Sequence, residues 1–115
     1  MGIFLECSAS NCYANVSDGT TALTSDFPAV NLNEWTHMTA VVDRTANRLY
    51  VYKNGVLSGS QANISGIGSL SSGTSASIGN NDSNLYPLKG FIDDVRVYNR
   101  ALSASEVLQL YNMGR

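Results

Sequence analysis

The sequence predicts an all-β protein: an antiparallel sandwich closed by one short C-terminal helix. Small polar residues and ten glycines are abundant, whereas charged residues make up only 14% of the chain. That composition is typical of short strands joined by tight turns rather than of a helical bundle. Segments in which apolar and polar residues alternate recur between turn signals, and only the C-terminal end shows helical spacing.

Length and charge limit the organisation and the partners of the chain. A chain of 115 residues is expected to form a single domain, residues 1–115. The net charge is -2 and the seven basic residues are scattered, so we expect neither nucleic acid nor a membrane surface as a partner. No apolar run reaches membrane-spanning length. Residues 1–6 lack the basic start of a signal peptide, which predicts either a cytoplasmic protein or an export signal outside this sequence.

The first part of the chain predicts short strands separated by turns. These strands are expected at residues 3–7, 12–16 and 20–24. The turn signal at residues 17–19 ends the second strand. A loop is expected from residue 26 to residue 33, because Pro28 cannot donate a hydrogen bond to a ladder and restricts the residue before it.

The two cysteines, Cys7 and Cys12, lie on either side of the first expected turn. If residues 8–11 form a hairpin loop, the two sulfurs face each other across the strands and can close a disulfide. Two free thiols are an equal alternative, because the redox compartment is undetermined. A metal site is the weakest interpretation, since the chain has no further cysteine and its one histidine is distant.

The centre of the chain carries the clearest strand signals. Residues 35–43 alternate in the manner of a strand, and residues 48–52 are rich in β-formers. Asn54-Gly55 is the strongest short hairpin signal, and it predicts residues 56–60 as the returning strand.

The last third predicts a brief strand at residues 76–79, a polar loop at 80–84 and a long strand at 89–98. A helix then follows. Ser103 and Glu106 fit a capping box, and Leu102 and Val107 fit a hydrophobic staple around it. Gly114 is a natural end of that helix.

Four blocks of sequence occur together in a recognisable order: EWTHMTAVVD at residues 34–43, LYVYKNG at 49–55, Ile-Gly at 78–79 and GFIDDVRVYNRALS at 90–103. In this the chain resembles the laminin G-like domains of the concanavalin A-like lectin/glucanase superfamily. The resemblance covers roughly the last two-thirds of the chain. It implies a jelly-roll sandwich of two antiparallel sheets and a non-catalytic module that binds a glycan or a protein, often in an extracellular or periplasmic location.

The chain departs from the family at its start, because a full domain carries several further strands before the segment that begins near Ile3. We therefore expect an N-terminally shortened domain with an exposed sheet edge. Exposed edges tend to pair with another chain. The expected assembly is a homodimer or a higher oligomer.

The resemblance also implies a ligand site in the polar loop before the last strand. In the related pentraxins, the loop after the matching Ile-Gly supplies calcium ligands, which points to Asn81 and Asp82 as metal ligands and to calcium as a cofactor. The expected ligand-binding residues are Asn80, Asn81, Asp82, Asn84 and Tyr86. The alternative is a solvated turn, since Asn, Asp and Ser are common turn formers.

Three other residues are interpreted as structural. Asp93 and Asp94 are expected on opposite faces of a strand, where the inward carboxylate needs a donor such as Arg44, Arg48 or a backbone amide. Trp35 is interpreted as a core anchor. We predict no catalytic residues, because no two carboxylates converge as glycoside hydrolysis requires and no nucleophile, phosphate-loop or zinc pattern occurs. The leading prediction is a carbohydrate-binding, lectin-like module, and the alternative is a structural or protein-interaction domain that oligomerises through a sheet edge.

Overall fold

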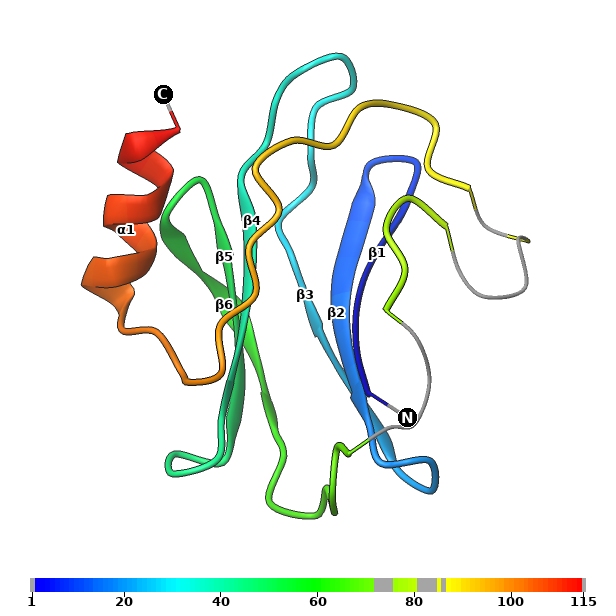
Figure 1. The fold of residues 1–115 in the computed structure, drawn as a ribbon, viewed down its shortest axis with the longest axis vertical. Helices are drawn as coiled ribbons and strands as arrows, with labels where there is room; N and C mark the ends of the chain where they lie inside the picture. Colours follow the sequence, from blue (N-terminus) through cyan, green and yellow to red (C-terminus); the bar gives the residue numbers. More distant parts are fainter. Residues whose placement is uncertain (1, 72–75, 81–84, 86, 115) are drawn as a thin grey trace.

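The computed structural model describes residues 2–71, 76–80, 85 and 87–114. Its elements are β1 (Gly2–Ser8), β2 (Asn11–Ser17), β3 (Ala22–Asp26), β4 (Met38–Asp43), β5 (Arg48–Lys53), β6 (Val56–Asn63) and α1 (Ala104–Met113). Within this part of the chain the strands form two antiparallel sheets, ordered β1-β2-β3 and β4-β5-β6, and α1 lies beside the second sheet (Figure 1). The fold is the predicted β-sandwich with a short C-terminal helix, in agreement with a jelly roll.

The first sheet is built from adjacent hairpins. Cys7 pairs directly with Cys12 in the register of β1 and β2, and Ser8 pairs with Asn11, which leaves a two-residue turn. The turn residue Ala9 has a φ of 54°, a conformation that non-glycine residues adopt rarely. Cys7 and Cys12 form a disulfide bond, so the structure contains the first of the two predicted states.

The second sheet depends on the turn between β5 and β6. Asn54 and Gly55 have φ values of 51° and 78°, the left-handed conformation that a type I′ hairpin needs at both central residues. Gly55 also has a steric role, because a Cβ at this position would lie 2.9 Å from the side chain of Leu108 on α1. The Asn-Gly hairpin predicted from the sequence is confirmed.

The core lies between the sheets. Its buried residues come mainly from β2, β5 and the segment after β6: Cys12, Ala14, Val16, Phe27, Leu49, Val51, Ile64 and Ile67. Among the described residues, Ser25 and Ser58 are buried polar residues, and Ser25 is the more deeply buried. The Ser25 hydroxyl on β3 donates a hydrogen bond to the Leu49 carbonyl and accepts one from the Ala62 amide, each at 2.8 Å. Ser25 therefore links β3 of the first sheet to β5 and β6 of the second.

The helix α1 covers the outer face of the second sheet. Val107 is fully buried and packs with Leu102, Val41 and Tyr52 in a second apolar cluster. The predicted capping box is present, with the Ser103 side chain accepting from the Glu106 amide and the Glu106 side chain accepting from the Ser103 amide. Within the residues that the structure describes, no helix is long and apolar enough to cross a membrane.

The start of α1 should make stability depend on pH. The hydrogen bonds from Arg100, and next the bond from the Ser103 amide, lower the pKa of Glu106 from 4.5 to about 2. A carboxylate with a depressed pKa in the folded state stabilises above its unfolded pKa and loses that contribution as the pH falls. We expect the melting temperature of the wild type to fall toward that of Glu106→Gln between pH 4.5 and pH 2. A difference between the two proteins that stays constant over this range would contradict the assignment.

The strands predicted at residues 76–79 and 89–98 are absent from the described structure, and both for the same reason. Residues 76–79 and 91–98 are described, but neither segment forms a ladder with another described residue. The alternation at residues 91–98 is correct for a strand, yet a strand also needs a neighbour to accept and donate its backbone hydrogen bonds. Phe91 and Val97 are consequently 88% and 92% exposed.

The prediction for Asp93 and Asp94 is wrong for the same reason. Without a strand there is no inward face, and both carboxylates are exposed. Asp93 Oδ1 accepts a hydrogen bond from the Asp94 amide at 2.8 Å, and Asp94 itself has a φ of 51°. The arginines predicted as partners form other hydrogen bonds. Arg44 donates to the carbonyls of Ile67 and Gly68, after β6. Arg48 donates to the carbonyl of Asn47, the residue before it.

Candidate ligand-binding groove

The polar loop predicted as the ligand site lies largely outside the described residues. This applies to Asn81, Asp82, Asn84 and Tyr86, so the ligand and calcium assignments remain predictions. Asn80 is described and half-buried, next to a backbone hydrogen bond in which the Leu88 amide donates to the Gly79 carbonyl at 2.7 Å. Among the described residues, no group of three or more His, Cys, Asp or Glu side chains converges as a metal site would require.

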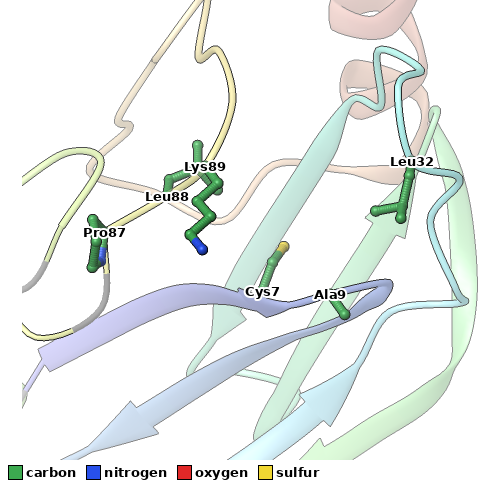
Figure 2. Close-up of a pocket in the computed structure, with 6 residues that line it drawn as sticks. All are labelled: Cys7, Ala9, Leu32, Pro87, Leu88 and Lys89. Atoms are coloured by element: carbon green, nitrogen blue, oxygen red, sulfur yellow. The ribbon is translucent and has the colours of Figure 1, made fainter.

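A groove of about 450 Å³ lies where three separate segments meet. Its lining comes from the β1–β2 hairpin (Cys7, Ala9), from the loop before β4 (residues 30–35) and from residues 88–91. We call it the Trp35 groove. A cavity of about 370 Å³ adjoins it at Cys7, Ala9, Leu32 and residues 87–89, where Figure 2 shows the side chains on the same three segments.

Two exposed aromatic side chains belong to the Trp35 groove. Trp35 is 70% exposed and Phe91 is 88% exposed. The prediction that Trp35 anchors the core is therefore wrong. Its physical reason is the start of β4 at Met38, which leaves Trp35 in the preceding loop rather than on a strand face that packs against the other sheet. The sequence pattern predicts Phe91 only as part of a strand and does not indicate that it lines a groove with Trp35.

Polar groups accompany the aromatic rings. Asn31 Nδ2 donates a hydrogen bond to Glu34 Oε2 at 2.8 Å, which fixes an amide and a carboxylate relative to each other within the groove. Asn33 and the cation of Lys89 lie in the same lining. An apolar cleft with a few fixed polar groups is the common form of a small-molecule site.

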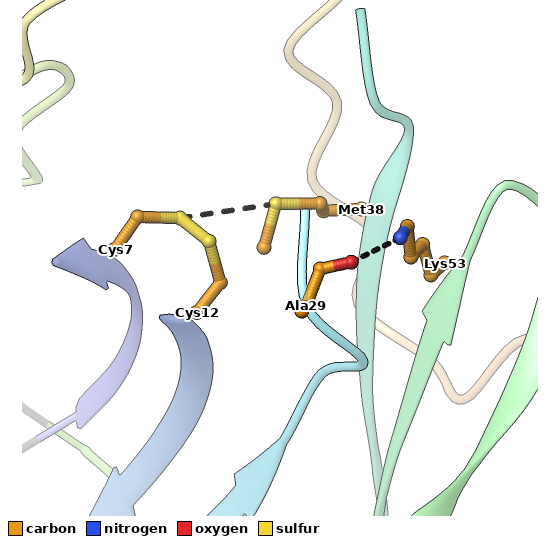
Figure 3. The surroundings of a disulfide bond; sticks show 5 residues. All are labelled: Cys7, Cys12, Ala29, Met38 and Lys53. Atoms are coloured by element: carbon orange, nitrogen blue, oxygen red, sulfur yellow. Dashed lines mark hydrogen bonds between the residues drawn. A yellow bond between two sulfur atoms is a disulfide. The ribbon is translucent and has the colours of Figure 1, made fainter. Parts of the chain in front are cut away.

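Hydrogen bonds hold the 27–33 loop against the β1–β2 hairpin. The Phe27 amide donates to the Cys12 carbonyl at 2.9 Å, and the Val30 amide donates to the Ser10 carbonyl at 3.0 Å. On the other side, Lys53 Nζ donates to the carbonyl of Ala29 (Figure 3). The loop is therefore tied to both sheets.

The disulfide helps to place the first wall of the groove. The sulfurs of Cys7 and Met38 are 4.0 Å apart, so the β1–β2 turn packs on the start of β4 (Figure 3). Because Cys7 lines the groove and is bonded to Cys12, the position of this wall is fixed covalently within its hairpin.

The segment between Trp35 and β4 is fixed by the β5–β6 turn. The Asn54 amide donates to the His37 carbonyl at 2.8 Å, and the His37 amide donates to Asn54 Oδ1 at 2.9 Å. The His37 ring packs near Tyr111 with ring centroids 5.9 Å apart, and its buried Nδ1 has no hydrogen-bond partner among the described residues. Burial first, and then the charge of Arg96, lower the pKa of this imidazole. His37 thus positions the loop that carries Trp35.

Comparisons with known proteins agree with this architecture. A family model described as the Concanavalin A-like lectin/glucanases superfamily matches residues 2–108. A similar solved structure is that of an S-layer domain-containing protein (residues 221–444) from Clostridium thermocellum, with 21% sequence identity and a TM-score of 0.55. The match covers 96% of this chain and 63% of that one, and at this identity it shows the fold alone. A search of curated proteins gave no match.

Proposed function

Because this chain belongs to the Concanavalin A-like lectin/glucanases superfamily, we propose that it is a non-catalytic module that binds carbohydrate in the Trp35 groove. The observation that carries the proposal is the exposed indole of Trp35 in a concave site that also holds a fixed amide–carboxylate pair. Domains of this kind often bind ligands, and this groove supplies both classes of contact that a sugar needs.

The chemistry of a pyranose ring matches these two classes of contact. One face of the ring is a row of C–H groups, which an aromatic face can cover, while hydroxyl groups at the rim donate and accept hydrogen bonds. Trp35 offers the aromatic face. Glu34 and Asn31 offer acceptor and donor groups at the rim, in an arrangement set before the ligand arrives. Binding at such a prearranged site costs less conformational entropy, because these side chains are already ordered.

A binding role also fits the acidic residues of the groove. Hydrolysis of a glycosidic bond generally uses two carboxyl groups that flank it, about 5–9 Å apart. Glu34 is the one acid in the described lining of the groove. The site therefore offers a hydrogen-bond acceptor but no second carboxylate to act with it, which supports binding without cleavage.

A glycan-array screen of the purified chain, run with calcium and again with a chelator, tests this proposal. Binding of a defined sugar in both buffers would support a site that does not need calcium, as proposed for the Trp35 groove. Binding that needs calcium would extend the site to the proposed calcium ligands Asn81 and Asp82. If no glycan binds in either buffer, the carbohydrate proposal is wrong.

A second candidate function is protein interaction through a sheet edge. The observation that favours it is β1, which among the described strands pairs only with β2, and whose Ile3, Phe4 and Leu5 are about half exposed. An apolar edge strand of this kind is a template for another chain. Light scattering over a range of protein concentrations tests whether the chain assembles, and a monomer at every concentration would count against this function.

A further inference from the structure

We propose that two copies of this chain pair through residues 91–98, which add to each other as antiparallel strands about a two-fold axis at Val95. The inference rests on the protein-interaction function above and names both its partner, a second copy, and its surface. That surface is distinct from β1, and it meets the Trp35 groove only at its first residue, Phe91.

The backbone of this segment is available for pairing. Residues 91–98 make no backbone–backbone hydrogen bond to another described residue. Their sequence alternates and contains valine, isoleucine, phenylalanine and tyrosine, the residue types that favour strands. In an extended strand Phe91, Val95 and Val97 would share one face, and all three side chains are exposed. The segment therefore has the composition of a strand and the exposure of an unpaired one.

The position of the segment leaves it accessible. Asp94 and Arg96 lie close enough to His37, just before β4, to shift its pKa. In Figure 1 the orange segment passes along the second sheet before it enters α1. All eight residues are exposed, so the approach of a second copy displaces no described core residue.

Symmetry and charge select one register. In a closed two-fold pair, opposite residues must lie on the same face of the sheet, so the axis passes through a residue that faces itself. An axis at Val95 places Asp94 opposite Arg96 twice and Ile92 opposite Tyr98 twice. An axis at Asp93, Asp94 or Arg96 would instead place identical charges opposite each other, which is unfavourable. An axis at any other residue would pair no more than three residues of the 91–98 segment with each other.

One local change accompanies pairing. Asp94 has a φ of 51°, and its amide is bound to the carboxylate of Asp93. In the paired strand Asp94 becomes extended, and its backbone groups can bond to the other copy in place of the Asp93 side chain. The left-handed conformation is uncommon for a non-glycine residue, so this change also releases a strained position.

Charge reversal tests the register. Asp94→Arg places arginine opposite arginine, and Arg96→Asp places aspartate opposite aspartate, so each variant should weaken the dimer about tenfold or more in analytical ultracentrifugation. An equimolar mixture of the two variants should form a heterodimer of wild-type affinity, because every arginine then faces an aspartate. Formation of the heterodimer also shows that both variants fold.

A variant at the other edge separates the two surfaces. Glu6→Arg on β1 should leave the dimer unchanged. If the wild type assembles and the charge reversals at positions 94 and 96 do not weaken the assembly, this inference is wrong, but the interaction function stands. Variants that stay monomeric on mixing would overturn the Val95 register. A wild type that is monomeric at all concentrations would overturn the inference and the interaction function together, whereas glycan binding by that monomer would still support the carbohydrate proposal.

Discussion

Ser25→Ala is expected to lower the free energy of unfolding by about 2–4 kcal/mol, a large effect for the loss of one oxygen atom. The Ser25 hydroxyl is fully buried and bonds both the Leu49 carbonyl and the Ala62 amide at 2.8 Å. Alanine removes a hydrogen-bond partner from each of these backbone groups between the sheets. A buried group left without its partner costs about 1–3 kcal/mol, and water has no room to replace the hydroxyl in a packed core.

Equilibrium unfolding in urea measures this change. Thr24→Ala is the matched control, because Thr24 neighbours Ser25 on β3 but its hydroxyl accepts an exposed hydrogen bond from Asn15. The control should change the free energy of unfolding by less than about 1 kcal/mol. If Ser25→Ala is no more destabilised than Thr24→Ala, the link between the sheets does not contribute as described.

The hydrogen bonds of Ser25 could not be predicted from the sequence. The strands around it could be predicted, because alternation and turn residues are local signals. The Asn54-Gly55 turn and the capping box at Ser103 were predicted for the same reason, since each is encoded within a few neighbouring residues. Nothing near Ser25 indicates that its partners are Leu49 and Ala62, which lie in the other sheet.

The strand predicted at residues 89–98 illustrates a different limit. Its alternation describes which side chains share a face but carries no information about a neighbour for the backbone. The prediction that Trp35 anchors the core failed in a similar way. Trp35 continues the alternating pattern of β4, but the ladder begins at Met38, and the side chain therefore remains exposed.

The candidate site was only partly accessible to sequence reasoning. Loop composition pointed to residues 80–86, where oxygen-bearing side chains are concentrated. The Trp35 groove instead depends on the meeting of the β1–β2 turn, the loop before β4 and residues 88–91. Which of these distant segments come together is determined by the topology of the fold and not by neighbouring residues in the sequence. The available local signals were an aromatic residue beside a polar loop, at Trp35, and the Cys7–Cys12 spacing that places the turn.

Trp35→Ala is expected to weaken glycan binding about 10- to 100-fold, which corresponds to about 1.4–2.7 kcal/mol. The loss follows from removing the aromatic face on which the apolar side of the sugar ring would lie, together with the apolar area buried there. Because the side chain is 70% exposed, the same change should alter stability little, so the effect on binding can be separated from unfolding.

The affinity of the sugar found by the array, measured by calorimetry, decides whether this groove is the site. Trp35→Phe retains an aromatic face and should recover part of the lost affinity, whereas a purely structural role for Trp35 would not distinguish the two variants in binding while both remain folded. Phe4→Ala is the matched control, because Phe4 is an exposed aromatic residue on β1 that does not line the groove. If the affinity of Trp35→Ala equals that of Phe4→Ala and the wild type, the sugar binds elsewhere, and the polar loop with Asn81 and Asp82 becomes the site to test.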